Sequence, residues 1–188
     1  AELLASGEVS SVDLVRASLE RIATVQPDLN CFVEVWAEEA LARAASIGPH
    51  NGRPLHGIPV AIKDTTPWEG HRVTYGSKMY RDNIADRSAL VVERLLEAGA
   101  VIVGSTNAPE FAHAGITDSP LLGPTRNPWD TTRTTGGSSG GSAPDPSLHL
   151  GPHPTWPRLG PVLWWSRHFG DRGFHPAGQL VELSEPPP

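Results

Sequence analysis

Apolar residues recur at helical spacing in two segments before residue 50. The first segment begins with Ser10 and Asp13, which have the spacing of a helix-capping pair, and Pro27 is expected to end the helix. The second amphipathic segment covers residues 34–46 and is followed by a Gly-Pro pair. The pattern predicts a helix at each place.

The next stretch alternates between strand and helix signals. An apolar, β-branched run at residues 58–62 predicts a buried strand that ends at Lys63. A helix capped by Ser88 and ended by Gly99 follows, and residues 100–104 predict a second buried strand. A strand, a helix and a strand in this order form a βαβ unit, which implies a mostly parallel sheet covered by helices. The fold class is therefore predicted to be α/β.

Charge and cysteine content narrow the possible partners. The 188 residues carry a net charge of −6 and a single cysteine, Cys31. An acidic chain lacks the basic excess of a nucleic-acid or anionic-membrane surface, and one cysteine forms neither an internal disulfide nor a multi-cysteine zinc site. No apolar stretch approaches the roughly 18 residues of a membrane-spanning helix. We expect a soluble, cytoplasmic protein that binds no nucleic acid and no membrane.

Proline is unevenly distributed along the chain. Residues 144–188 contain 10 of the 19 prolines, 3 of the 6 tryptophans and 4 of the 8 histidines. This stretch has no sustained hydrophobic periodicity of a helix or a strand, yet it is richer in aromatic residues than a disordered linker. The composition predicts a boundary between residues 1–143 and a tail at 144–188.

A segment made only of glycine and serine, at residues 136–142, precedes this boundary. Such a segment can be a flexible linker, a phosphate-binding loop or a catalytic loop. A Walker-type phosphate loop needs a lysine followed by Ser or Thr directly after the glycines, whereas Ala143 follows Ser142 here. The linker and the catalytic loop remain as alternatives.

Lys63 is unusual because it ends a buried strand. The apolar strand residues before Lys63 can exclude water from its amine, which lowers the pKa of the amine until it can accept a proton near neutral pH. A neutral lysine can then activate a serine hydroxyl. The alternative is that Lys63 reaches solvent and forms an ion pair with Asp64.

Four segments together resemble the amidase-signature family. They are VAIKD at 60–64, STNAPEF at 105–111, GPTRNPWD at 123–130 and GGSSGGSA at 136–143. The resemblance covers residues 1–143 and implies a mixed β-sheet between helices, incomplete in this chain. It also implies hydrolysis of a small-molecule amide through a Ser-Ser-Lys triad that needs no metal or cofactor.

The resemblance assigns roles to residues of this chain. Lys63 looks like the family's base, and Ser138 looks like its middle serine, which is held on a cis peptide bond and relays a proton. Ser139 resembles the loop serine that supports this network, and Gly136 and Gly137 make the backbone path possible.

Other residues receive weaker assignments. Ala112 falls where the family has part of its acyl-binding pocket, although plain packing is an equal alternative. Asn107 and Arg126 are expected to hold the loops around the site. Three histidines lack metal-ligand spacing and are interpreted as surface or loop residues: His56, His71 and His113.

The family's acyl-forming serine lies further along the chain, in a motif close to GTDxGGSIR. No GGS triplet occurs after Ser142, and the corresponding position is Val162. We therefore hypothesise a frameshift or truncation after Ala143, and we expect no normal amidase turnover from these 188 residues. The alternatives are the glutamine-hydrolysing subunit of a glutamine-dependent tRNA amidotransferase and a non-catalytic gene remnant. The amide substrate and the oligomeric state cannot be predicted from these motifs.

Overall fold

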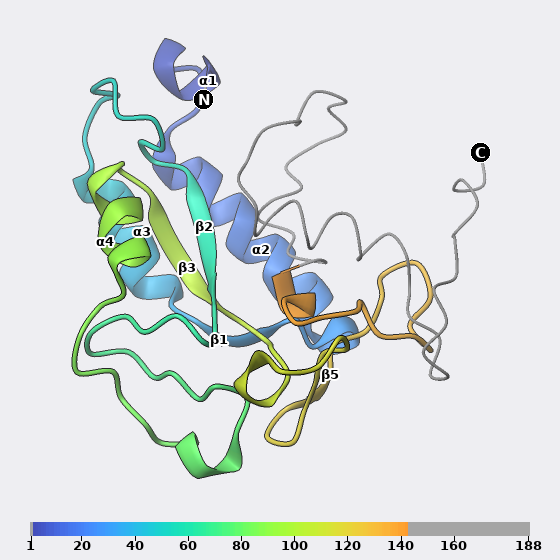
Figure 1. Ribbon diagram of the computed structural model, residues 1–188. Helices are drawn as coiled ribbons and strands as arrows, with labels where there is room; N and C mark the ends of the chain where they lie inside the picture. Colours follow the sequence, from blue (N-terminus) through green and yellow to red (C-terminus); the bar gives the residue numbers. More distant parts are fainter. Residues whose placement is uncertain (1, 143–188) are drawn as a thin grey trace.

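The computed structural model describes residues 2–142 (Figure 1). Its helices are α1 (Glu2–Ser6), α2 (Ser11–Leu29), α3 (Ala37–Ser46) and α4 (Leu90–Glu97). Its strands are β1 (Phe32–Val35), β2 (Pro59–Lys63), β3 (Val101–Thr106), β4 (Asp118–Ser119) and β5 (Gly123–Pro124). Three 3-10 turns complete this part of the chain: η1 (Lys78–Tyr80), η2 (Glu110–Ala112) and η3 (Gly140–Ser142). The predicted tail at 144–188 lies outside the described residues.

The main sheet has the strand order β1-β3-β2. Strands β2 and β3 are parallel and α4 connects them, as predicted for the βαβ unit. Strand β1 pairs with β3 in the antiparallel direction. The sheet is therefore mixed, and the predicted α/β class is confirmed.

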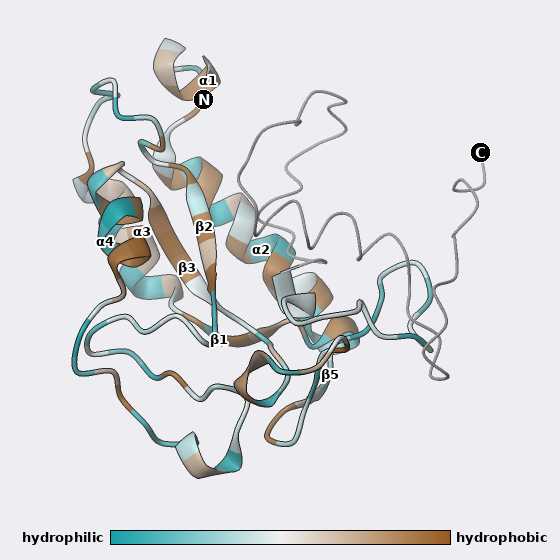
Figure 2. Ribbon diagram, viewed as in Figure 1, coloured by the Kyte–Doolittle hydropathy of each residue, from teal (hydrophilic) through white to brown (hydrophobic). Residues whose placement is uncertain are grey.

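Alternating side chains of β3 supply two hydrophobic clusters on opposite faces of the sheet. Val101 and Val103 pack in a cluster with Val15 and Ile22 of α2 and with the apolar face of α3. Ile102 packs in a second cluster with Val92 of α4. Because successive strand side chains point to opposite faces, β3 lies between α2 and α3 on one side and α4 on the other. Figure 2 shows the apolar colour along β3 and on parts of these helices.

Helix α2 begins as predicted but extends further than expected. The Ser10 hydroxyl accepts from the Asp13 backbone N–H, and the Asp13 side chain accepts from the Ser10 backbone, so the capping box is complete. The prediction that Pro27 ends the helix is wrong, because α2 continues to Leu29. Pro27 lacks an N–H donor, but helical hydrogen bonding resumes beyond it, because Asn30 N–H donates to Gln26 O at 2.9 Å.

Two other boundaries also differ from the prediction. Residues 34–46 are not one helix, because β1 occupies Phe32–Val35 and α3 begins at Ala37. The antiparallel pairing of β1 with β3 overrides the local helical pattern there. Ser88 does not cap α4, since the N-cap residue is Ala89 and the Ser88 hydroxyl accepts instead from the backbone N–H of Glu69.

Candidate active site

The end of β2 brings Lys63 close to the glycine-serine segment. Lys63 Nζ donates to Ser138 Oγ at 3.0 Å, across 75 positions of sequence. Parallel pairing places Lys63 opposite Thr106 of β3, so both side chains leave the same face of the sheet. The structure therefore brings together the two residues that the sequence predicted as base and middle serine.

Burial changes the acidity of the Lys63 amine. Loss of solvent lowers the pKa of Lys63 to about 8, because a desolvated environment disfavours the charged form. A minority of the amine is then neutral near physiological pH.

Asp64 does not form the ion pair that was the alternative for Lys63. Its carboxylate accepts from the backbone N–H groups of Thr74 at 2.8 Å and Gly76 at 3.2 Å, and also from the Thr74 hydroxyl. Burial raises the pKa of Asp64, while these hydrogen bonds oppose the shift. Asp64 thus anchors the following loop to the end of β2, and Lys63 is left to contact Ser138.

The glycine-serine segment is part of the fold. Ser139, Gly140 and Gly141 are buried, so the linker alternative is wrong. The Gly137–Ser138 peptide bond is cis, as the resemblance implies, and Gly136 has a φ of +80°. Gly136 is buried, and a Cβ at Gly137 would lie 2.8 Å from the backbone of Ile116. The backbone path through the segment therefore depends on glycine at these positions.

A pair of hydroxyl groups joins this segment to β3. The oxygens of Thr106 Oγ1 and Ser142 Oγ are 2.7 Å apart, and Thr106 is fully buried. The sequence patterns assign neither residue a role, although Thr106 lies in the family segment at 105–111 and Ser142 in the one at 136–143. Their pairing links the ends of two distant segments, so only the register of the sheet and the fold of the loop reveal it.

Ala112 lies in η2, next to a strained turn. Phe111 and Ala112 have φ values of 51° and 55°, in the left-handed region that non-glycine residues seldom adopt. The backbone connects this turn to the site, since Phe111 N–H donates to Tyr75 O and Tyr75 N–H donates to Asp64 O. Ala112 is half-buried and remains a predicted lining residue.

The two residues expected to hold the loops make such contacts. The Asn107 side-chain amide donates to Gly123 O at 3.1 Å and to Thr125 Oγ1 at 3.0 Å. The Arg126 guanidinium donates to Thr131 O at 2.9 Å. Both side chains therefore join neighbouring parts of the loop region after β3.

The three histidines singled out from the sequence make local contacts. His56 is buried in a loop and its Nε2 lies 3.2 Å from Gly48 O, whereas His71 Nε2 lies 2.8 Å from a Glu39 oxygen. His113 is exposed. Among residues 2–142, no three His, Cys, Asp or Glu side chains gather as metal ligands would. In the same part of the chain, no helix has the length and apolarity needed to cross a bilayer.

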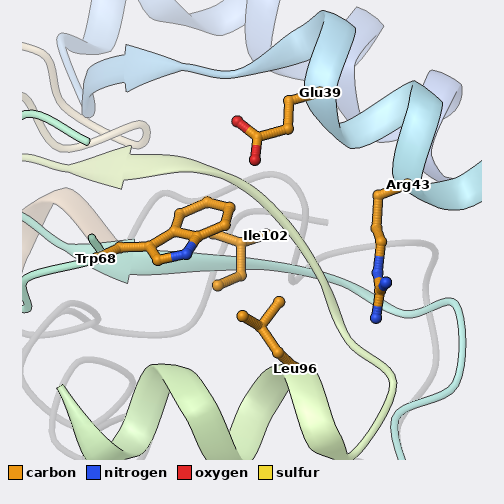
Figure 3. A pocket seen from close by; sticks show the side chains of 5 residues that line it. All are labelled: Glu39, Arg43, Trp68, Leu96 and Ile102. Carbon is orange, nitrogen blue, oxygen red and sulfur yellow. The ribbon is translucent and has the colours of Figure 1, made fainter. Parts of the chain in front are cut away.

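A pocket of about 350 Å³ lies between α3, α4 and β3 (Figure 3). Five residues line it, none of them predicted as a site residue: Glu39, Arg43, Trp68, Leu96 and Ile102. Figure 3 shows Glu39 and Arg43 reaching from α3, with Leu96 coming from α4 opposite them. This pocket is separate from the contact between Lys63 and Ser138.

Comparisons with known proteins point to one family. The family model for amidases matches residues 13–144. The chain is 46% identical over 145 residues to a glutamyl-tRNA(Gln) amidotransferase subunit from Synechococcus sp. (strain CC9605), covering 74% of this chain and 30% of that protein. It is 38% identical over 173 residues to the indoleacetamide hydrolase of Bradyrhizobium diazoefficiens, covering 89% of this chain and 33% of that protein.

Among solved structures, a 6-aminohexanoate cyclic dimer hydrolase complexed with substrate matches with a TM-score of 0.70 and 35% identity, over 76% of this chain and 30% of that one. The chain thus spans about a third or less of the length of these relatives. The family match, the mixed sheet and the four sequence segments agree, and the chain belongs to the amidase-signature family.

Proposed function

We propose that this chain carries the base and the relay serine of an amide-hydrolysing site. Lys63 would accept a proton from Ser138, and Ser138 would accept one from a nucleophilic serine as that serine attacks the amide carbonyl. The protonated Lys63 would return its proton through Ser138 to the leaving amine or ammonia, and water would then release the acid. The single observation that supports this proposal most is the 3.0 Å contact between Lys63 Nζ and Ser138 Oγ.

The lowered pKa of Lys63 fits this role. With a pKa of about 8, about a tenth of Lys63 is the free amine at pH 7. An ordinary lysine, with a pKa of about 10.4, would be almost entirely protonated there. Hydrolysis that depends on Lys63 should therefore rise with pH and level off above about pH 8.

A chimera tests whether this segment works as base and relay. Residues 2–142 would replace the matching segment of the indoleacetamide hydrolase, which supplies the remaining two thirds of its own sequence. We expect the chimera to hydrolyse indoleacetamide, and we expect Lys63→Ala or Ser138→Ala to reduce kcat/KM by about 10²-fold or more. The exposed Lys78→Ala is the matched control. A folded chimera whose activity is unchanged by Lys63→Ala would refute the proposal.

The 188 residues by themselves are proposed to give no normal turnover. They contain no GGS triplet after Ser142, which is the triplet expected around the nucleophile. Ammonia release from simple primary amides by the purified chain should therefore equal the buffer rate. Turnover that disappears in Lys63→Ala would contradict this expectation.

A second candidate function is that of the glutamine-hydrolysing part of an amidotransferase. The support is the 46% identity to a subunit of a glutamyl-tRNA(Gln) amidotransferase. In such an enzyme, the protein would act on glutamine and assemble with partner subunits, whereas a free amidase would act on a small-molecule amide alone. Comparing glutamine with indoleacetamide in chimeras built on each relative distinguishes the two, because preference for glutamine supports only the amidotransferase.

The third alternative is a gene remnant without activity. Circular dichroism during heating of the purified chain separates this case from a folded domain. A cooperative transition supports a folded domain. Broad melting or early aggregation supports the remnant.

A further inference from the structure

We propose that Thr106 is a positioning residue, whose hydroxyl holds the glycine-serine segment against β2 so that Ser138 stays within reach of Lys63. This inference rests on the proposed function of Lys63 and Ser138. It adds a residue that neither the family match nor the sequence motifs assign. It concerns how the pair is held, and it gives Thr106 no part in proton transfer.

The hydroxyl of Thr106 is shared by two distant segments. Thr106 Oγ1 lies 3.3 Å from Ile62 O, directly before Lys63 on β2, and 2.7 Å from Ser142 Oγ at the end of η3. A hydroxyl donates one hydrogen and also accepts. When Thr106 donates to Ile62 O, Ser142 donates to Thr106, and one buried oxygen then connects β2 with the segment that carries Ser138.

The register of the sheet makes this arrangement possible. Lys63 and Thr106 are paired neighbours on parallel strands, so their side chains lie next to each other on one face. Their partners, Ser138 and Ser142, are four positions apart in the glycine-serine segment. Two parallel contacts therefore join the strands to this segment, one through the amine of Lys63 and one through the hydroxyl of Thr106.

Two further hydrogen bonds hold η3 next to this contact. Gly141 N–H donates to Asn107 O at 3.1 Å, and Gly140 N–H donates to Thr117 Oγ1 at 2.9 Å. Both bonds hold the first two residues of η3 against the region after β3. The bond between Ser142 and Thr106 ends on an oxygen that also donates to Ile62 O of β2, so its loss should loosen Ser138 from Lys63 while these two anchors remain.

The chain offers a favourable test because it has two lysines, Lys63 and the exposed Lys78. Trace acetylation with acetic anhydride, followed by mass spectrometry, gives the reactivity of Lys63 relative to Lys78 between about pH 6 and 11. The midpoint of the Lys63 profile reports its pKa. The ion pair that could complicate the profile does not form, because the Asp64 carboxylate is bonded to Thr74 and Gly76.

Thr106→Val keeps the shape of the side chain and removes the hydroxyl, whereas Thr106→Ser keeps the hydroxyl and removes the methyl group. In the wild-type chain we expect a midpoint near 8. In Thr106→Val, water reaches the amine and the midpoint moves toward the ordinary lysine value of about 10.4. Thr106→Ser should restore the wild-type profile.

Ser142→Ala provides a second route if Thr106→Val does not fold. It removes the other hydroxyl and should shift the midpoint in the same direction, and the double variant should shift it no further, since both changes break one contact. Ser18→Ala is the matched control, because it removes a buried hydroxyl bonded to Leu14 O at 3.0 Å within α2. It should leave the midpoint near 8.

Three outcomes would overturn the inference. A folded Thr106→Val, or Ser142→Ala in its place, that keeps the wild-type midpoint shows that the hydroxyl does not position the segment. A shift in Thr106→Ser as large as that in Thr106→Val shows that the methyl group is responsible. A wild-type midpoint near 10.4 overturns both this inference and the proposed function, whereas the first two outcomes leave the proposed function standing.

Discussion

At the scale of single residues, the position of Lys63 makes its amine unusual. The preceding strand is apolar, the Asp64 carboxylate is bonded elsewhere, and the amine donates to a serine hydroxyl. A charged amine in such a place loses hydration without gaining an opposite charge, and its pKa falls for that reason. The same burial that prepares Lys63 for proton transfer therefore reduces the stability of the fold.

This cost predicts how stability depends on pH. The folded-state pKa of Lys63, about 8, lies below its unfolded value, about 10.4, so the unfolded chain binds more protons between these pH values. The Lys63 contribution to the free energy of unfolding therefore rises with pH across this window. Lys63→Met has no such contribution. In urea unfolding, its free energy of unfolding should exceed that of the wild-type chain below pH 8, and this difference should shrink toward pH 10.4. A difference between the two chains that is independent of pH would argue against a desolvated Lys63.

At the scale of elements, close backbone approach fixes the glycine-serine segment. A Cβ added at Gly141 would lie 2.3 Å from Asn107 N, 2.4 Å from Asn107 O and 2.7 Å from Cys31 O. These are backbone atoms, which cannot rotate away as the end of a side chain can. The segment can approach the end of β3 this closely only with glycine at that position.

Gly141→Ala should therefore displace the segment. We expect a loss of about 1–3 kcal/mol in the free energy of unfolding, the usual range for overpacking, together with a changed reactivity of Lys63. Gly115→Ala is the matched control, because its Cβ would meet nothing within 4 Å. Urea unfolding of both variants measures the difference. Equal stability of the two would show that the segment does not lie against β3 in solution.

The elements differ in how far the sequence could predict them. Strands β2 and β3 and the helix between them follow from local apolar runs, and Lys63 and Ser138 follow from the family's motifs. Strand β1 could not be found locally, because it forms by pairing Phe32–Val35 with residues some 70 positions later. The same holds for Thr106 and Ser142, whose contact depends on register and loop path.

At the scale of the whole molecule, residues 2–142 leave several large apolar side chains in solvent. Leu90 and Val91, which are neighbours at the start of α4, are 65% and 54% exposed, and Trp129 is 60% exposed. The curated relatives are about three times longer than the matched region. Adjacent exposed apolar side chains favour association.

We expect the purified chain to self-associate as its concentration rises. Val91→Glu places a charge on the apolar start of α4 and should reduce the association measured by sedimentation velocity. Ser46→Glu is the control, because it adds the same charge at an exposed polar position of α3. Equal sedimentation of the two variants would show that α4 does not contribute.

The pKa of Lys63 tests the central claim most directly. In protein labelled with ¹³C-lysine, the two lysines give separate Cε signals, and Lys78→Arg identifies the signal of Lys63. The chemical shift of Cε would be followed by NMR as the pH is raised. A lysine that serves as base toward Ser138 should titrate with a midpoint near 8. A midpoint near 10.4 would contradict the account, because the amine would then be hydrated and charged at neutral pH.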